Sequence, residues 1–329
     1  MRLMGISMAV VMVGFGAGCG SDTARPDHTP TCRVDSCGNE SFRRAVPTRA
    51  DVLIRFPATA GAKVSTLDAV AGTYLWTGDL VGQLNDEVDD VFLTLEDAVS
   101  GAPEIADGDV HQWRVPQGSR DAVLRLDRTG DDQFLLTYDV VPTGEQPSPD
   151  AILAGEVAAD AFETTIDLDA LTDVEPGASA SGQIVLRTQP FANGLAEHWY
   201  DFHQVSLDGE PAEDSRLTYW EFTADSAALE LVGDFGDRNG AVYVRWDDSG
   251  GRYDHHLDVI DGTEELLTNC WVGGGAEVFL GAAWTDELGD WTAELDGSED
   301  DCVFGPVADL PVDADEFDDL PAPGEWSQL

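Results

Sequence analysis

The feature that most constrains the fold of this chain is a long succession of short segments rich in β-branched and aromatic residues. From Val110 onward they recur roughly every 10 to 14 residues, and the connectors RTGDD, GDRNG, DDSGG and IDGTE carry the Gly and Asp that hairpin turns need. Consecutive hairpins build an antiparallel meander. We predict strands at residues 110–115, 122–127, 133–141, 162–168, 183–189, 198–206, 216–223, 227–235, 241–248, 252–260, 266–272, 277–285 and 291–295.

A meander of this length has a consequence for its overall shape. Open twisted sheets rarely exceed about ten strands, so the sheet is expected to curl or to close. The predicted fold class is therefore mainly β, with a large antiparallel meander that forms a curved sheet or an incomplete barrel. Residues 51–306 are expected to form one β-rich domain, because that length is enough to bury a sizeable core.

One segment before the strands has the period of a helix. Between about residues 79 and 100, apolar residues recur every three or four positions and make one stripe, and Gly101 and Pro103 are expected to end the helix. The stripe consists of Leu80, Leu84, Val88, Val91, Phe92, Leu95 and Val99. The acids expected to face away from it are Asp86, Glu87, Asp89, Asp90, Glu96 and Asp97. The amphipathic helix is expected to pack on the concave face of the sheet.

The first residues have the three regions of a secretory signal peptide. Arg2 supplies the positive charge, residues 6–15 are apolar, and residues 16–18 are small. The apolar stretch is shorter than the roughly 20 residues that a membrane-spanning helix needs. We therefore predict a leader at residues 1–18.

The sequence Gly16-Ala17-Gly18-Cys19 resembles the lipobox of bacterial lipoproteins, although Gly16 stands where leucine is expected. The resemblance implies a mature chain that begins at Cys19, carries acyl chains there and is anchored to the membrane lipid. Two or more such chains hold stably, since each buried methylene contributes about 0.8 kcal/mol. Gly20, in place of Asp, implies the outer membrane. The alternative is an ordinary secretory leader with an incidental cysteine.

The other four cysteines form an even set in a chain expected to be exported. Such a set indicates two disulfides, with three possible pairings. Pairing of near neighbours is expected, Cys32 with Cys37 and Cys270 with Cys302. The spacing CRVDSC has neither the CxxC nor the His pair of a zinc site.

The formal net charge of −47 is unevenly placed. Residues 20–50 hold five arginines and four acids, 5 − 4 = +1, whereas residues 51–329 hold 60 acids and 11 basic residues, 11 − 60 = −49. We interpret residues 19–50 as a disulfide-bearing tether beside the membrane and residues 307–329, with seven acids, as an extended acidic tail. The acidity excludes nucleic acid as a partner class and indicates either a solvated surface or binding of divalent cations.

Two groups of side chains are candidates for a site. Asp254, His256 and Asp258 alternate along a predicted strand, so they share one face and could hold a metal or tune a general base. The same alternation is also typical of the polar outward face of an exposed strand.

Trp199, Asp201 and His203 also share a face, as a sugar-stacking surface with an acid beside it would require. Core packing of the tryptophan is the alternative. No HExxH, P-loop or dinucleotide motif is present.

The order of leader cysteine, tether, helix and meander is similar to that of acidic bacterial lipoproteins with no assigned activity, and this resemblance bears on architecture alone. We expect a lipid-anchored envelope protein that acts by binding or structure, without a cofactor, and whose ligand is a small molecule, a glycan or another envelope protein. One alternative is a glycosidase-like hydrolase that uses dispersed carboxylates such as Asp201 or Asp254. Another is a carrier of lipid or lipoprotein, in which the helix acts as a lid on the curved sheet. Since the sequence contains no catalytic motif, we favour a protein that is not an enzyme and keep the hydrolase as the alternative.

Overall fold

The structure is a computed structural model. It describes residues 42–57, 70–148, 151–158, 161–174, 180–190, 196–207, 213–223, 225–234, 238–259, 262–286 and 288–306, without the side chains of residues 83 and 86–90. The predicted leader, Cys19, the pair Cys32 and Cys37, and the acidic tail lie outside the described residues.

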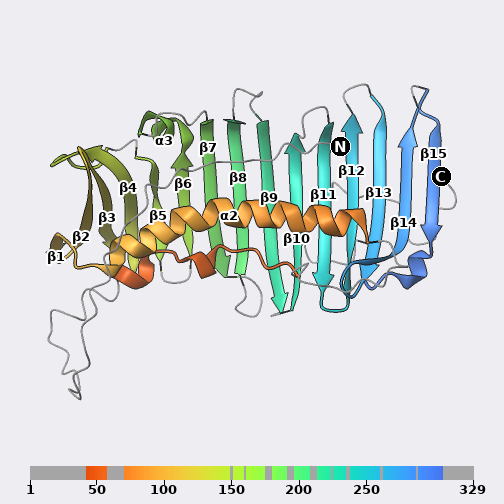
Figure 1. Cartoon of the computed structure of the whole chain (residues 1–329), viewed down its shortest axis with the longest axis horizontal. Coiled ribbons are helices and arrows are strands. Elements are labelled where there is room, and N and C mark those ends of the chain that lie inside the picture. The colour runs from red at the N-terminus through yellow and green to blue at the C-terminus, as the bar shows by residue number, and fades with distance from the viewer. Residues whose placement is uncertain are drawn as a thin grey trace, which may run out of the picture.

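Fifteen antiparallel strands form one sheet in which each strand pairs with the next in sequence. The first eight are β1 (Ile105–Asp107), β2 (Val110–Gln117), β3 (Arg120–Gly130), β4 (Gln133–Pro142), β5 (Leu153–Ala158), β6 (Phe162–Asp167), β7 (Ala180–Pro190) and β8 (Ala196–Leu207). The others are β9 (Glu213–Thr223), β10 (Ser226–Asp234), β11 (Arg238–Asp247), β12 (Gly250–Val259), β13 (Glu264–Val272), β14 (Ala276–Thr285) and β15 (Trp291–Gly297). Because β1 and β15 lie at opposite ends, the sheet is open (Figure 1).

All of the predicted strands are present, which confirms the meander and the mainly β class. The sequence did not indicate β1, which is only three residues long, or β5, whose sequence LAGEVA has no aromatic residue. The strand predicted at 162–168 ends at Asp167, because the short helix α3 (Leu168–Val174) begins there.

Helix α2 (Gly72–Ser100) lies across the strands and covers one face of the sheet (Figure 1). Its 29 residues span about 43 Å, which matches about nine strand spacings of about 4.8 Å. Near its start Trp76 packs edge-on against Tyr253 of β12, and near its end Phe92 packs against Phe162 of β6. A helix of this length lets the sheet remain open, since it buries one face of many strands at once.

Most residues of the predicted apolar stripe of α2 are buried or pack against the core. Leu84, Phe92 and Leu95 are buried, and Leu80, Val91 and Val99 pack against the core. The side chain of Val88 is outside the description, as are those of Asp86, Glu87, Asp89 and Asp90. Asp97 is exposed as expected, whereas Glu96 is half-buried.

The helix begins at Gly72, earlier than predicted, because its first turns pack against the hairpin between β13 and β14. The Ala71 N–H donates to the Gly275 carbonyl at 2.9 Å, and Tyr74 lies against Gly275. Gly275 has a φ of +96°, and a Cβ there would come within 2.5 Å of the Tyr74 ring. A glycine is therefore required at this turn for both reasons.

Residues before the predicted domain boundary at residue 51 also belong to the packed body. Phe42, Ala45 and Val46 are buried, and the Phe42 ring stacks on His111 with centroids 3.6 Å apart. The boundary was placed by charge, which changes at residue 50, but burial of apolar side chains defines the body. The predicted tether of residues 19–50 is therefore wrong for its last residues, from Phe42 on.

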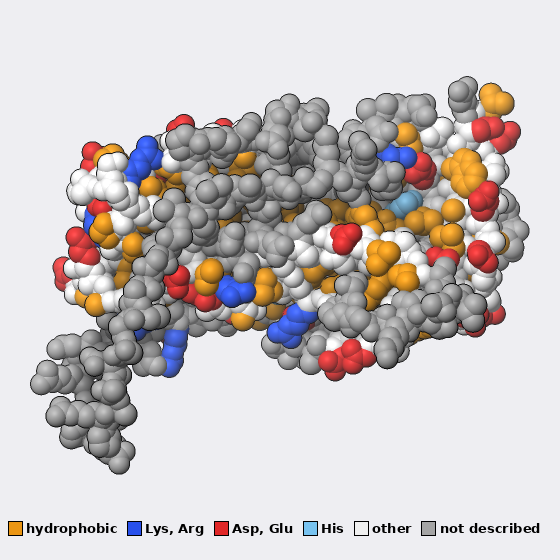
Figure 2. Space-filling view, viewed as in Figure 1, with side chains coloured by type: hydrophobic (Ala, Val, Ile, Leu, Met, Phe, Trp, Pro, Cys, Tyr) orange, Lys and Arg blue, Asp and Glu red, His pale blue; other side chains and the backbone are white. Residues whose placement is uncertain are grey.

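Alternation along each strand gives the sheet two different faces. We call the side under α2 the helix face and the other side the far face. Tyr253 and Leu257 of β12 lie in the core on the helix face, so Asp254 and His256 point to the far face. Seen from the helix side, apolar side chains gather along the middle of the molecule, and carboxylates are spread around its rim (Figure 2). Among the described residues, no helix is both long and apolar enough to cross a bilayer.

Candidate functional site

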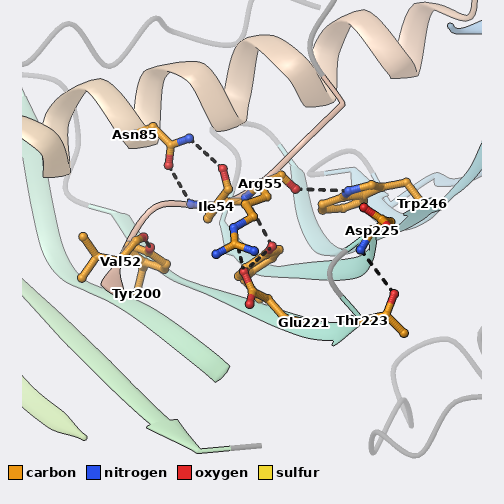
Figure 3. A network of polar contacts seen from close by, with 10 residues as sticks. Val52, Ile54, Arg55, Asn85, Tyr200, Glu221, Thr223, Asp225 and Trp246 are labelled. Atoms are coloured by element: carbon orange, nitrogen blue, oxygen red, sulfur yellow. Dashed lines mark hydrogen bonds and ion pairs between the residues drawn. The ribbon is translucent and has the colours of Figure 1, made fainter. Parts of the chain in front are cut away.

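Residues 51–57, which we call the strap, run between α2 and the sheet (Figure 3). Residues 53–57 belong to no helix or strand. The Leu53 N–H donates to the Arg49 carbonyl at 3.1 Å, whereas side chains supply the partners of Ile54 and Arg55. The Ile54 N–H donates to Asn85 Oδ1 at 2.9 Å, and Asn85 Nδ2 donates to the Ile54 carbonyl at 2.8 Å. One carboxamide on α2 thus satisfies both backbone groups of one strap residue.

The sheet binds the strap from the other side through long side chains on its helix face. The Tyr200 hydroxyl donates to the Val52 carbonyl, and Trp246 Nε1 donates to the Arg55 carbonyl at 3.2 Å (Figure 3). The Arg55 N–H donates to the Tyr219 hydroxyl at 3.2 Å. Strands β8, β9 and β11 therefore each contribute one side chain that recognises an extended backbone.

Burial sets the protonation of the groups around the strap. Burial raises the pKa of the Tyr200 and Tyr219 hydroxyls, so both remain protonated donors at neutral pH. Burial also lowers the pKa of His198 to about 4, and its Nδ1 lies 2.9 Å from the Thr188 hydroxyl. These groups hold a polypeptide segment in place and do not form an acid–base pair for chemistry near pH 7.

The far face carries a buried charge network on β12. Arg252 Nε donates to both carboxylate oxygens of Asp254, at 2.8 and 3.1 Å, and Arg252 Nη1 donates to Glu299 at 3.1 Å. The Thr268 hydroxyl donates to Asp254 at 2.6 Å. Burial disfavours the charge of Arg252, but the carboxylates of Asp254 and Glu299 outweigh it and raise the pKa of Arg252.

A disulfide keeps Glu299 in this network. Cys270 of β13 is bonded to Cys302, as predicted, with their Cα atoms 5.4 Å apart. Cys302 directly follows the short helix η3 (Glu299–Asp301), which therefore lies against the far face. The crosslink covers Arg252 and Asp254, whose side chains are only 3% and 1% exposed.

Of the predicted metal candidates, Asp254, His256 and Asp258 do share the far face, but they do not form one site. Asp254 is fully buried and bound to Arg252, so it is not part of a polar outward surface. Its place beside His256 and Asp258 is taken by Glu264 of β13. One possible ligand atom from each of these three side chains lies within 4.8 Å of the others.

Trp199, Asp201 and His203 also lie on one face, as the register with β7 shows. Asp201 is bound by Arg216, the Arg187 guanidinium lies 5.4 Å from the centroid of the Trp199 ring, and His203 is exposed. The tryptophan is half-buried on the far face and is not part of the main core. Arg187 therefore covers the Trp199 ring on which a sugar would stack, and Arg216 binds the Asp201 carboxylate that would contact it.

The carboxylates predicted for a hydrolase, Asp201 and Asp254, are likewise bound by arginines. Asp201 on β8 and Asp254 on β12 are four strand spacings apart, roughly 19 Å, whereas a glycosidase pair stands about 5–9.5 Å apart. Each of the two accepts hydrogen bonds from an arginine.

Sequence reasoning missed the strap and Glu264, although both left a signal. The sequence DVLIRF is rich in β-branched and other apolar residues, which correctly indicates an extended segment but not that its partners are side chains. Asp258 and Glu264 each lie three residues from Asp261 in the IDGTE turn, so counting outward from that residue pairs them.

No family model, no curated protein and no solved structure matches this chain. Its function is therefore inferred from its own residues.

Proposed function

We propose that this chain is a lipid-anchored protein of the bacterial cell envelope, attached to the outer membrane through acyl chains on Cys19, and that its sheet is a rigid binding or structural module. The leader and the lipobox-like segment support the anchor. The observation that carries the proposal is the strap, which is the first extended segment after the tether and lies bound between α2 and the sheet.

The strap suits a protein that is held at its N-terminal side. Force transmitted from an anchor reaches the body through residues 42–57. Its backbone is bound by Asn85 on α2 and by Tyr200 and Trp246 on β8 and β11, near the middle of the sheet. A pull from the anchor therefore reaches first Phe42, which stacks on His111 of β2, and then the strap, where the helix and several strands share the load.

The charge distribution fits the same placement. A tether of nearly balanced charge tolerates an anionic membrane surface, whereas a body with a balance of 11 − 60 = −49 beyond residue 50 is repelled by it. The body would then stand away from the lipid and present its faces to a partner.

The carrier alternative receives less support than a binding or structural role. Under a helical lid, a carrier needs space for its cargo. Tyr74, Phe92 and Trp271 are buried between α2 and the sheet, and they belong to one continuous apolar cluster. Side chains of the protein therefore occupy the place where an apolar cargo would lie.

Expression of the full-length chain in a bacterium with two membranes tests the anchor. We expect the protein in the outer-membrane fraction, with acyl chains at Cys19 found by mass spectrometry. Cys19→Ser should remove the protein from the outer-membrane fraction, so that it is found as a soluble protein or as a precursor with its leader uncleaved. The control Cys32→Ser should leave it in the outer membrane. An unmodified thiol at Cys19 in a soluble wild-type protein would overturn the proposal.

The binding role is tested on the purified protein by thermal shift with envelope glycans, phospholipids and peptidoglycan fragments. A reproducible rise in Tm with one class identifies the ligand class. No shift with any of them rejects small-ligand binding and leaves a structural role or a protein partner, which crosslinking in intact cells would then detect.

A further inference from the structure

The far face of β12 and β13 carries a second cluster of titratable groups, separate from the strap and from the Arg252 network. Asp258 lies directly opposite Glu264 in the register of these two strands, and His256 precedes Asp258 by two residues on the same face. An imidazole and two carboxylates from neighbouring strands therefore converge. We propose that His256, Asp258 and Glu264 bind a divalent transition-metal ion of the zinc type, a site that does not depend on the lipid anchor.

The spacing of the three groups is suitable for one ion. Their nearest ligand atoms lie within 4.8 Å of one another. Ligands at about 2.0–2.2 Å from a tetrahedral zinc ion are roughly 3.3 Å apart, so the gaps close by side-chain rotation. Asp258 is exposed and the Glu264 side chain is 45% exposed, so both have room to rotate.

The imidazole provides the second, independent observation. His256 Nε2 is buried and has no hydrogen-bond partner among the described residues, and it points at Glu264 Oε2 from 3.7 Å. A buried ring nitrogen without a partner costs free energy. Coordination of a metal by its lone pair would remove that cost.

The surrounding charge also favours a cation. Asp234, Asn239, Asp258 and Glu264 form one row across β10 to β13, in which each residue lies opposite the next. Like charges directly opposite each other, such as those of Asp258 and Glu264, destabilise a sheet, and the row contains a third carboxylate, Asp234, and no Arg or Lys. A bound divalent ion would compensate the repulsion between the two opposed carboxylates, for which this row supplies no basic residue.

The neighbours hold the ligands in position. Leu266 lies opposite His256 in the register and is buried, so the imidazole has an apolar flank where electrostatic attraction is stronger. The Glu264 N–H donates to the Thr285 hydroxyl at 2.8 Å, which fixes the backbone of that ligand. One nitrogen and two carboxylate oxygens suit zinc, cobalt or manganese better than calcium, which prefers oxygen ligands alone.

The test is a titration of the full-length chain, purified in detergent and stripped with a chelator, with ZnCl₂ in about 150 mM NaCl, where diffuse binding to surface acids is screened. We expect one zinc ion per chain by calorimetry. His256→Ala and Glu264→Gln should each weaken binding at least tenfold. The matched controls His203→Ala and Glu294→Gln, an exposed histidine and an exposed acid elsewhere, should change affinity less than about twofold.

Substitution with Co²⁺ gives a second readout, because Co²⁺ held in a four-coordinate site has strong visible d–d bands that His256→Ala should abolish. Glu264→Gln is isosteric and partly exposed, so it tests the site even if His256→Ala fails to fold. The proposal is overturned if zinc does not bind, or if both variants bind as many ions as wild type with equal affinity. In the latter case, the diffuse acidic surface alone would account for binding.

Discussion

The two faces of the sheet are built by the same alternating strands, yet different forces hold them. On the helix face, the buried Trp271 packs on Tyr74 of α2, and the Tyr219 hydroxyl accepts a hydrogen bond from the strap. On the far face, arginine–carboxylate pairs recur from Arg114 with Asp121 to Arg252 with Asp254. Alternation therefore decides which face a side chain joins, while the covering layer decides how strongly its contact stabilises the fold.

Two ion pairs on the far face show how a covering segment changes the exposure of charged side chains. Arg252 and Asp254 are buried beneath the segment tied down by the Cys270–Cys302 disulfide, whereas the side chain of Arg216, the partner of Asp201, is 59% exposed. Two ion pairs of the same chemistry are thus expected to differ in energy, because water screens only one of them.

The largest effect is expected from truncation on the helix face. Trp271→Ala removes a buried indole that packs on Tyr74, and it should lower the free energy of unfolding by about 3–5 kcal/mol. Leu135→Ala on the far face, where the side chain is 42% exposed, should cost about 0.5 kcal/mol. Urea unfolding followed by tryptophan fluorescence measures both. Equal losses would mean that the two faces do not differ as described.

The next effect separates the two ion pairs. Arg252→Ala leaves the Asp254 carboxylate buried without its arginine, so the free energy of unfolding should fall by about 3 kcal/mol. This value is at the lower end for buried ion pairs, because the Thr268 hydroxyl still donates to Asp254. Arg216→Ala should cost less than about 1 kcal/mol. Adding Asp254→Asn to Arg252→Ala should recover part of the loss, since it removes the unpaired charge. If the two single variants lose the same stability in chemical denaturation, burial is not the deciding factor.

The strap provides a smaller effect. Asn85→Ala leaves the N–H and the carbonyl of Ile54 without their side-chain partners, so the unfolding free energy should fall by about 2 kcal/mol. Hydrogen exchange at Ile54 should accelerate in the same variant. Asn239→Ala, an exposed asparagine on the far face, is the control and should change stability by less than about 0.5 kcal/mol. Unchanged exchange at Ile54 would contradict the role of Asn85.

The smallest effect is a pH slope from His198 on the helix face. Its pKa is about 4 in the folded chain and about 6.5 when unfolded, so the unfolded state binds more protons between these values. The stability that the neutral, buried His198 contributes is fully present above pH 6.5 and is lost as the pH falls toward 4. Between pH 6 and pH 5 the free energy of unfolding should fall by about 1 kcal/mol for this reason. His198→Gln should flatten this slope in thermal melts, while His203→Gln on the far face should not. An identical slope in both variants would rule out His198 as the source.

Local patterns predicted much of the fold and little of the candidate sites. Turn residues and β-branched runs are local signals, so most strand positions followed from them. The start of α2 did not, because GTYLWTG has the composition of a strand and is a helix where Tyr74 packs against Gly275 and Trp76 against Tyr253. Likewise, Asp254 alternates with His256 and Asp258, but Arg252 and Thr268 bind it away from them.

The positions of the turns, most of the strands and the side chains that share a face follow from local sequence, because these features depend on neighbours a few residues apart. The open sheet, the binding of the strap by side chains from α2 and distant strands, and the position of Glu264 beside His256 and Asp258 do not follow from local sequence. These outcomes depend on strand register and on the packing of layers, and both are set by residues far apart in the chain.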